Sequence, residues 1–439
     1  MKGIRCMVFL AVLPSIIAGQ NSGKIPLEKA ISEGLKKDCE YANTLLEKEQ
    51  AETQVRLSEK DKRLRLSFDG NYFYRSETMA VDFPSTQIPG GGLIPEREVE
   101  AGVNHNFDLN LAITQPLFTG GILSNSVKME ELRAVVQTHQ TTLRENEIAG
   151  LIKTSYFQYL LLIRKRKSLS ALAKILRLHR RRIEDLIREG LVRRTDLLET
   201  LSRIEEIRAG MTDVDQAIES EKINFRRLCG YDPEEIDDAY REKTTTREKA
   251  LSYFENNHPV LKSLQNRLDM LSLQKKIASG RYLPQVSGFA EVHYGKPGVD
   301  YFAKEWTLYF QGGIRVTVPL FDWNRLGSRK ALIDINRRKL ENQRRKFIRD
   351  VTASLDRFFS ALQKLEAKSA HIRQMIAYSG EDAALKESLY AEKQIPNVDY
   401  LAALLTREKN VLAGEEVRIQ IEKIRAGINT LIGKNKEGV

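Results

Sequence analysis

The chain has 439 residues, of which 41% are apolar and 29% charged, and its formal net charge is +11. This composition is typical of globular proteins, and it excludes a disordered chain or a protein of many membrane-spanning helices. Acidic and basic residues alternate along predicted helices, as in Arg180–Asp185, so the charge indicates solvated helix faces rather than a nucleic-acid-binding patch.

The first 19 residues have the layout of a secretory signal peptide. Lys2 and Arg5 supply positive charge, residues 7–18 are almost continuously apolar, and small residues precede a polar stretch at 20–23. The apolar run is too short to span a bilayer as a helix, and no cysteine follows it where a lipid anchor would form. We therefore expect an exported protein.

Two cysteines follow the predicted signal peptide, and both lie in stretches with a helical pattern. Cys39 and Cys229 are expected to be separate buried thiols rather than a disulfide. The six histidines are scattered, and no Cys/His cluster has the spacing of metal ligands. We therefore expect neither a metal nor a cofactor.

An internal repeat organises the rest of the chain. Three segments recur at one constant offset: Gln115–Phe118 as Val318–Phe321, Thr195–Leu198 as Val398–Leu401, and Leu228–Gly230 as Leu431–Gly433. Earlier in each half the offset is larger, so that Phe68, Gly70 and Tyr72 match Val286, Gly288 and Ala290. We assign the extra residues to a loop rich in proline and glycine at 78–99. The predicted boundaries are 20–230 for the first repeat, 231–248 for a polar linker, 249–433 for the second repeat and 434–439 for a tail.

Each repeat is predicted to begin with a helical stretch, at 27–62 and at 250–279, and to continue with two strands. The strands are expected at about 64–78 and 99–117, and at about 283–296 and 304–319. Apolar residues alternate strictly with polar ones, which is the pattern of half-buried strands. In the first repeat the residues on one face of the second strand are Val103, His105, Phe107, Leu109, Leu111 and Ile113.

A proline marks the corner between the last strand and the first long helix of each repeat. Proline can end a strand and can open a helix, so these corners are predicted turning points, although an ordinary strand-to-helix turn has the same pattern. The corner residues are Pro116, Leu117 and Phe118 in the first repeat and Pro319, Leu320 and Phe321 in the second. Trp323 follows the second corner.

Two long helices close each repeat, at about 120–189 and 195–229, and at about 324–392 and 397–432. No proline interrupts the first of them, and apolar residues recur at three- and four-residue steps, as in coiled coils. About 65 residues at ~1.5 Å each make a rod of roughly 100 Å. Short turns after Glu189 and after Glu392 return the chain as an antiparallel partner.

Four strands in one chain cannot close a transmembrane barrel, since the smallest bacterial barrels need about eight. An open sheet in lipid would leave unpaired backbone edges. The strands therefore belong either to a soluble sandwich or to a barrel shared by several chains. The signal peptide and the aromatic residues around the strands favour the shared barrel.

With this organisation the chain resembles the TolC-type outer-membrane efflux protein family over essentially its whole mature length. The resemblance is carried by the duplicated corners Gln115–Gly121 and Val318–Asn324, by the tip segment Gly190–Asp196 and by the twofold strand–strand–helix–helix order. It implies a mainly α fold with a transmembrane β part. Three copies would share one twelve-stranded barrel, continued into a coiled-coil tunnel that is closed at its periplasmic tip.

The resemblance also implies a function. The chain would be the outer-membrane exit channel of a tripartite efflux pump or of a type I secretion system, and it would conduct substrate passively. Its helical part would lie in the periplasm. Its partners would be a periplasmic adaptor (membrane fusion) protein, an inner-membrane transporter and outer-membrane lipid, with no nucleic acid.

The residues of the implied gate lie at the helical tips. Asp399 matches a position that forms an acidic pore constriction in the family, and the second acidic position of the family pattern is Ala402 here. Asp196 and Tyr390 match a latch, for which we expect a phenol–carboxylate hydrogen bond. A helix N-cap at Asp196 and a solvated carboxylate at Asp399 are equally compatible with the sequence. The predicted adaptor-docking tip is Gly190, Leu191 and Val192.

Two other classes of protein fit parts of the pattern. A periplasmic coiled-coil scaffold or adaptor would share the long helical hairpins, but it would lack the duplicated strand pairs. An exported enzyme is not expected, because the sequence contains no nucleophile elbow, phosphate-binding glycine loop or zinc motif.

Overall fold

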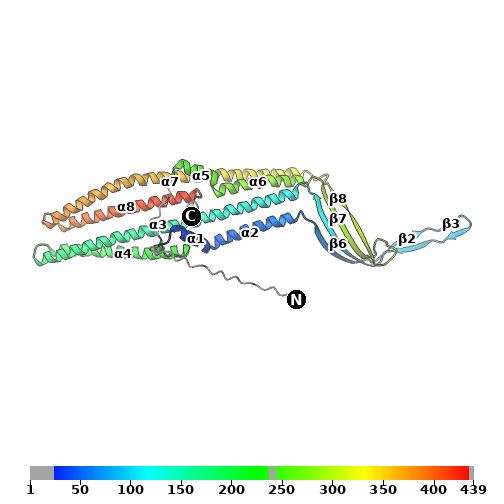
Figure 1. The fold of residues 1–439 in the computed structure, drawn as a ribbon, viewed down its shortest axis with the longest axis horizontal. Helices are drawn as coiled ribbons and strands as arrows, with labels where there is room; N and C mark the ends of the chain where they lie inside the picture. The colour runs from blue at the N-terminus through cyan, green and yellow to red at the C-terminus, as the bar shows by residue number, and fades with distance from the viewer. Residues whose placement is uncertain (1–23, 237–241, 243–244, 435–439) are drawn as a thin grey trace, which may run out of the picture. The chain divides into compact units, whose positions relative to one another are not determined.

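The computed structural model describes residues 24–236, 242 and 245–434 (Figure 1). The predicted signal peptide and the tail after residue 434 lie outside the described residues. The chain forms two compact units. The sheet unit comprises Cys39–Glu145 and Arg247–Asp356, and the helical unit comprises the described residues up to Asp38 together with those of Asn146–Thr246 and Arg357–Val439.

The sheet unit contains a four-stranded antiparallel sheet in the order β1-β6-β7-β8 (Figure 1). Its strands are β1 Arg65–Tyr74, β6 His105–Phe118, β7 Gln285–Lys296 and β8 Thr307–Thr317. The central pairing, β6 with β7, therefore joins the two repeats. The outer strands β1 and β8 each keep one edge of backbone groups that no described strand pairs.

The segment that sequence analysis assigned to an extended loop forms two small hairpins. β2 Met79–Phe83 pairs with β5 Arg97–Ala101, and β3 Thr86–Ile88 pairs with β4 Gly92–Ile94. The turn of the inner hairpin contains Gly90 and Gly91, both at positive φ. Proline and glycine pointed to a loop because these residues mark the turns, while each strand is only three to five residues long.

Helices line up beside one another in the same order as the strands that they precede or follow. Hydrogen bonds join α2 (Cys39–Lys60) to α3 (Ile122–Arg188), and an ion pair joins α6 (Pro259–Gly280) to α7 (Arg325–Ala391). Gly280 at the end of α6 lies against the start of α3. The order is therefore α2-α3-α6-α7, with α5 (Arg247–Asn257) leading into α6.

The lengths of the helices that precede the strands give the number of residues by which the two repeats are offset in this part of the chain. α1 Leu27–Lys37 and α2 have the same lengths as α5 and α6, so Lys60 corresponds to Gly280. Phe68 consequently corresponds to Gly288 and not to Val286. The offset inferred from sequence was therefore two residues too short. A slip of two residues keeps every side chain on the same face, so alternation alone could not detect it. Downstream, α3 and α7 are both 67 residues long, which matches the constant offset found in the sequence.

The predicted helical stretch at the start of each repeat is two helices. α1 ends at Lys37, because Asp38 has an extended backbone, and α2 begins at Cys39. In the second repeat His258 is extended before Pro259 and caps the new helix through its ring nitrogen, which accepts from the Val260 N–H. Proline disfavours a helical conformation in the residue before it, which explains this break.

The helical unit is built from two antiparallel hairpins, α3 with α4 (Arg194–Cys229) and α7 with α8 (Asn397–Leu431) (Figure 1). A short 3₁₀ turn, Pro233–Glu235, follows α4. Leucine and isoleucine side chains from three helices form one core cluster, whose buried members are Leu172, Ala173, Leu176, Ile204, Ile207 and Leu401. This heptad-like packing is what the three- and four-residue spacing predicted.

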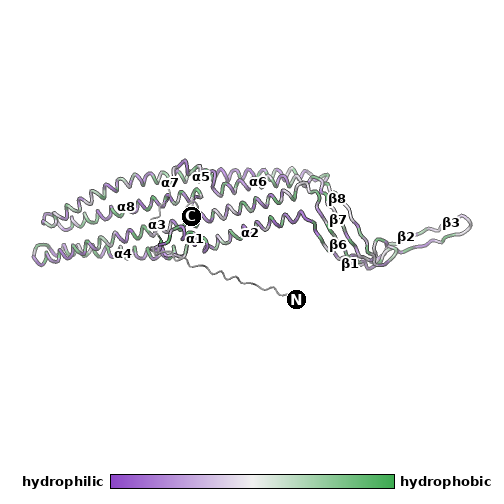
Figure 2. Tube along the Cα trace, in the orientation of Figure 1, coloured by the Kyte–Doolittle hydropathy of each residue, from purple (hydrophilic) through white to green (hydrophobic). Residues whose placement is uncertain are grey.

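Hydropathy is mixed along both units. Figure 2 shows hydrophilic and hydrophobic residues interleaved along the helices and the strands. Among the helices of the described residues, none has a stretch long and apolar enough to cross a membrane.

The two cysteines differ from each other. Both are free thiols, as expected, but only Cys229 is buried, while Cys39 at the start of α2 is exposed. The expectation of two buried thiols was therefore wrong for Cys39, because the helix face that carries it has no covering element in the described chain.

Candidate conduction wall and tip gate

One face of the four-stranded sheet carries apolar side chains that align across all four strands. Phe68 pairs with Leu111, Leu111 with Val292, and Val292 with Phe310. All four side chains are exposed, and Phe310 is 70% accessible. A second row of the same kind contains Leu109, Tyr294 and Leu308. Sheets of soluble proteins bury such a face, so this face needs an apolar surrounding.

The opposite face is polar and holds a hydrogen-bonded cluster. The imidazole of His293 on β7 lies 2.9 Å from the Asp108 carboxylate on β6, and the Gln311 side-chain amide on β8 lies 3.1 Å from its other ring nitrogen. The Tyr309 ring stacks on His293 with a centroid distance of 4.8 Å. The sheet thus has one apolar face and one polar face, which is the pattern of strands in outer-membrane barrels.

The two strand-to-helix corners share their backbone path but not their residues. In the first repeat Gly120 and Gly121 have φ of 57° and 77°, and in the second Trp323 and Asn324 have 56° and 59°. A left-handed conformation costs glycine nothing but costs a bulky residue about 1–2 kcal/mol. Trp323 is nevertheless held there, largely exposed and edge-on to Phe321 at a centroid distance of 5.0 Å.

The prolines of the corners occupy different positions in their strands. Pro116 lies within the central strand β6, where the register shifts between Pro116 and Phe118, so the missing N–H falls at an irregularity of the ladder. Pro319 follows the end of the edge strand β8 at Thr317. Leu117, Leu320 and Phe321 are exposed beside them. The chain therefore turns from strand to helix just after both prolines, and the corner surface is apolar.

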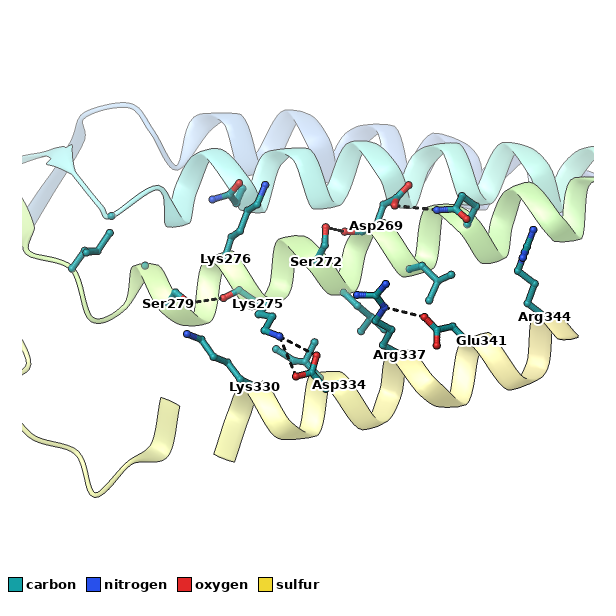
Figure 3. Close-up of a pocket in the computed structure, with 18 of the residues that line it drawn as sticks. Asp269, Ser272, Lys275, Lys276, Ser279, Lys330, Asp334, Arg337, Glu341 and Arg344 are labelled. Atoms are coloured by element: carbon teal, nitrogen blue, oxygen red, sulfur yellow. Dashed lines mark hydrogen bonds and ion pairs between the residues drawn. The ribbon is translucent and has the colours of Figure 1, made fainter. Parts of the chain in front are cut away.

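A groove of about 1000 Å³ runs along α6 and α7 beside the start of α3 (Figure 3). Its walls are charged: Lys275 pairs with Asp334 at 3.0 Å, and Arg337 pairs with Glu341 at 3.0 Å. The remaining cationic lining residues are Lys276, Lys330, Arg344 and Arg345. Small-molecule pockets are mostly apolar, so this open groove is a solvated helical wall rather than a ligand site.

Both helical hairpins turn with the same geometry at their tips. α3 ends where the Leu191 N–H donates to the Leu186 carbonyl, with Gly190 at φ 71°. α7 ends where the Gln394 N–H donates to the Leu389 carbonyl, with Lys393 at φ 64°. These are left-handed helix ends of the Schellman type, and the second lacks the glycine that usually occupies that position.

Asn397 joins three helices at the tip, and sequence analysis did not identify it. Its buried side-chain oxygen accepts a hydrogen bond from Nε2 of His179 on α3, and its amide donates to the Asp196 carbonyl at 3.2 Å and to Thr200 Oγ1 at 3.3 Å. Both contacts of the amide tie α8 to α4. An asparagine directly after a helix-opening proline reads as an ordinary turn residue, so only its tertiary partners reveal this role.

Three rings pack around this polar centre. Tyr390 of α7 and Tyr400 of α8 stack in parallel with centroids 5.5 Å apart, and His179 contacts them at 5.1 and 4.9 Å. Burial among these rings lowers the pKa of His179, although the hydrogen bond to Asn397 acts in the opposite direction. Burial also raises the pKa of Tyr390, with a further contribution from Asp196. His179 is therefore neutral at pH 7.

The structure brings Asp196 and Tyr390 to the same tip without the expected hydrogen bond. The buried Tyr390 hydroxyl has no hydrogen-bond partner among the described residues, and Asp196 participates through its backbone carbonyl. Asp196 is also not a helix N-cap, because Arg193 holds that position, and its acid lies in the first turn of α4. A carboxylate there is favoured by the helix dipole.

Asp399 lies in the first turn of α8 with an exposed side chain. In the part of the chain that the structure describes, its carboxylate makes no hydrogen bond or ion pair. Leu191 is also exposed, beside Gly190 at the turn between α3 and α4. The acid and the predicted docking residues are thus accessible at the tips of their hairpins.

A buried ionic network holds the linker between the repeats. The Glu242 carboxylate pairs with Lys153 of α3 at 2.8 Å and accepts from the Asn429 amide of α8 at 2.8 Å. Its backbone N–H donates to Glu422 at 2.9 Å. The side chains of Lys153 and Glu242 are almost completely buried. The linker therefore contacts both hairpins through charge, which its polar composition did not predict.

Residues 250–434 match the outer membrane efflux protein family. The second repeat is an outer membrane efflux protein domain. The first three helices of the first repeat have the same lengths as their counterparts in the second, so the helical arrangement of this domain occurs twice in the chain. No curated protein matches the sequence.

Solved structures share the fold at low sequence identity. VceC from Vibrio cholerae is 14% identical, with a TM-score of 0.72 over 93% of this chain and 96% of that chain. The CmeC outer membrane channel of Campylobacter jejuni is 12% identical, with a TM-score of 0.70 over 96% and 91%. The open state of the MtrE outer membrane channel of Neisseria gonorrhoeae is 13% identical, with a TM-score of 0.69 over 98% of both chains.

These matches confirm the mainly α fold with its β part. The match over residues 250–434 agrees with the predicted TolC-type outer-membrane efflux family. Proteins of this family are passive channels and not enzymes. Channels of the family are trimers that work with an adaptor and an inner-membrane pump.

Proposed function

We propose that three copies of this chain form one twelve-stranded barrel and a continuous helical tunnel, which is the exit duct of a tripartite efflux pump or of a type I secretion system. Substrate is driven by an inner-membrane transporter and reaches the duct through a periplasmic adaptor. The duct itself opens and closes but performs no chemistry.

The observation that carries this proposal is the combination of two unpaired strand edges with an exposed apolar face. In hydrocarbon every backbone polar group needs an internal partner, so a four-stranded sheet is stable there only if identical sheets pair edge to edge. Four strands from each of three chains reach a number at which bacterial barrels close. The polar cluster around His293 then lines the water-filled side.

The gate of the proposed duct is the tip. Three Asp399 carboxylates, one from each copy, form an acidic constriction that prefers cations. Asp196 and Tyr390 hold the tip closed together with Asn397 and His179, which link the two hairpins. The exposed turn Gly190–Val192 docks the adaptor.

Single-channel recording in lipid bilayers tests this gate. Asp399→Ala is expected to lower the preference for cations, and Asn397→Ala, which removes the side-chain hydrogen bonds between the hairpins, is expected to raise the open probability. Asp213→Ala is the matched control, because Asp213 is an exposed acid on the length of α4. If both tip variants conduct like the wild type and like the control, the gate assignment fails.

Extraction of outer membranes with urea separates the channel from its main rival. A periplasmic scaffold or adaptor would be released by urea, whereas a barrel embedded in lipid stays in the membrane fraction. Release of the protein by urea would contradict the channel.

A further inference from the structure

The polar face of the four-stranded sheet carries its acidic side chains in three neighbouring rows. Asp108 on β6 lies in the first row and Glu291 on β7 in the third. Asp69 on β1 lies in the row between them, where it is paired with Asn110. These three rows of the described sheet contain no lysine or arginine. We call Asp69, Asp108 and Glu291 the acidic belt.

The cations of the same face lie nearer the helices. Arg65 at the start of β1 is paired with Thr114, one row beyond Glu291, and Arg315 of β8 is paired with Ser287 two rows beyond it. The guanidinium of Arg315 is also held over the Phe289 ring, 5.2 Å from its centroid. Charge is therefore segregated along the polar face, and the acids of the belt are not neutralised by these arginines.

His293 lies at the centre of the acidic belt and contacts two of its carboxylates. Only 7% of its surface is exposed. Its Nδ1 lies 2.9 Å from the Asp108 carboxylate, and its Nε2 lies 3.5 Å from the Glu291 carboxylate. The titratable groups around the ring are therefore Asp108 from β6, Glu291 from β7 itself and Tyr309 from β8, which stacks on it, while Asp69 of β1 lies one strand farther away, beyond Asn110.

The partners of the imidazole can satisfy both of its protonation states. A carboxylate only accepts hydrogen bonds, so in the neutral ring Nδ1–H donates to Asp108, and Nε2 accepts from the Gln311 amide. In the protonated ring Nε2 also carries a hydrogen, for which Glu291 supplies an acceptor. The site can therefore gain a proton without leaving a buried polar atom unpaired.

We propose that His293 sets the charge selectivity of the barrel lumen, by reducing the negative charge of the acidic belt when its imidazole is protonated. This proposal rests on the proposed function, in which the polar face lines the water-filled lumen. Three copies then bring nine carboxylates and three imidazoles into one ring, so protonation cancels a third of the formal negative charge. The barrel thus selects cationic solutes at a place separate from the tip.

The direction of the pH dependence follows from the charges. The preference for cations is greatest when the imidazole is neutral, and it declines as the pH falls through the range in which His293 gains its proton. Salt limits the reach of the belt, because the Debye length is about 8 Å at physiological ionic strength and about 30 Å at 0.01 M. Small ions therefore report the belt best at low salt.

Reversal potentials in phosphatidylcholine bilayers test this selectivity, with a potassium chloride gradient kept at or below about 0.1 M. The reversal potential measures the ratio of cation to anion permeability in the open pore, and it does not depend on how often the tip opens. For the wild type we expect a cation preference at about pH 8 that shifts toward zero at about pH 5.5, on either side of the ordinary pKa of histidine. His293→Gln is expected to keep the alkaline reversal potential at both pH values.

Each variant has a matched control in the same part of the chain. His105→Gln should retain the wild-type pH dependence, because His105 lies on the apolar face of β6, with its Nδ1 3.0 Å from the Tyr72 hydroxyl. Asp108→Asn should lower the cation preference at the alkaline pH. Asp82→Asn removes the same charge from the hairpin strand β2, outside the belt, and should leave the preference unchanged.

The outcomes separate this proposal from the proposed function. A wild type whose reversal potential does not change with pH, a pH shift that persists in His293→Gln, or an Asp108→Asn channel that selects cations as strongly as the wild type overturns the role of the belt, while a conducting trimer leaves the proposed function intact. A protein that is a monomer in detergent, or that carries no current either as the wild type or as Asn397→Ala, overturns the proposed function itself. A pH shift that is lost in His293→Gln and kept in His105→Gln supports the proposal.

Discussion

The molecule contains the same junction twice, once closed and once open. Between β6 and β7 the helices α3 and α6 cover each other, and Gly120 approaches the Gly280 backbone so closely that neither position has room for a side chain. At the outer strands the corresponding helices α7 and α2 are exposed, and Trp323 stands where the closed junction has Gly120. The two junctions therefore differ in side-chain size, with glycine where one chain packs on itself and tryptophan at the edge that the proposed trimer completes.

The first difference between the two junctions is the linker, residues 231–248. It joins the two repeats covalently, so it connects the two sides of the closed junction and not those of the open one. Glu242→Gln removes the carboxylate that faces buried Lys153, which is expected to destabilise the fold by about 3–5 kcal/mol. Urea unfolding followed by circular dichroism measures this loss. The exposed pair Arg203–Glu206 provides the control, and Glu206→Gln is expected to cost about 1 kcal/mol or less. Equal effects would mean that the linker is not held by charge.

The corners give the second contrast. Gly120→Ala places a Cβ at φ 57° and against the Gly280 backbone, so strain and overpacking together are expected to cost about 2–5 kcal/mol. Trp323→Ala has the same φ but nothing in the described chain to clash with, so folding should change little. Thermal unfolding of both variants decides this, and equal losses would show that the two corners are packed alike.

Two leucines, one buried on α6 and one exposed on α7, supply a third contrast, between folding and assembly. Leu273→Ala opens a cavity in the closed junction and is expected to reduce the stability of each chain by about 2–5 kcal/mol. Leu332→Ala, on the open edge, should leave the unfolding of the separated chain unchanged and lower the temperature at which the oligomer dissociates in detergent. A loss of chain stability in both variants would contradict the claim that Leu332 is exposed within its own chain.

His179 makes the two hairpins differ at the tip, because Asp382 occupies the corresponding position in the second repeat. Its pKa is lowered by burial, so the neutral form is favoured in the packed tip. Stability from this cluster is therefore fully present above about pH 6.5, the ordinary pKa of histidine, and is lost as the pH falls toward the lowered value. The protection factors of the tip amides, which correct hydrogen-exchange rates for their intrinsic pH dependence, should therefore fall on acidification. His179→Gln should abolish this dependence, whereas persistence of the dependence would assign it to other groups.

The smallest effect is expected at the tip turns. Lys393→Gly relieves a positive φ that Gly190 already accommodates in the other hairpin, and should change stability by up to about 1 kcal/mol. Backbone relaxation in the turn stabilises the variant, while the greater freedom of glycine in the unfolded chain opposes it. Thermal unfolding compared with Gly190→Ala, which should be destabilising, checks the assignment.

Sequence patterns predicted the architecture because the repeat, the alternation and the long helices are local signals. They gave an offset between the first strands of the two repeats that was two residues too short. Phe68 points to the same face of its strand whether it is matched with Val286 or with Gly288, so alternation could not reveal the slip. They also missed Asn397, His179 and Glu242, whose roles depend on partners distant in sequence. A buried polar contact leaves no periodic pattern, so only the fold reveals it.

The central claim is that identical copies complete the open edges of the four-stranded sheet, and native mass spectrometry of the detergent-solubilised protein tests it most directly. The account predicts a single species of three chains, which dissociates only when the detergent or the temperature also disrupts the sheet. A stable monomer that stays soluble in water without detergent would contradict it.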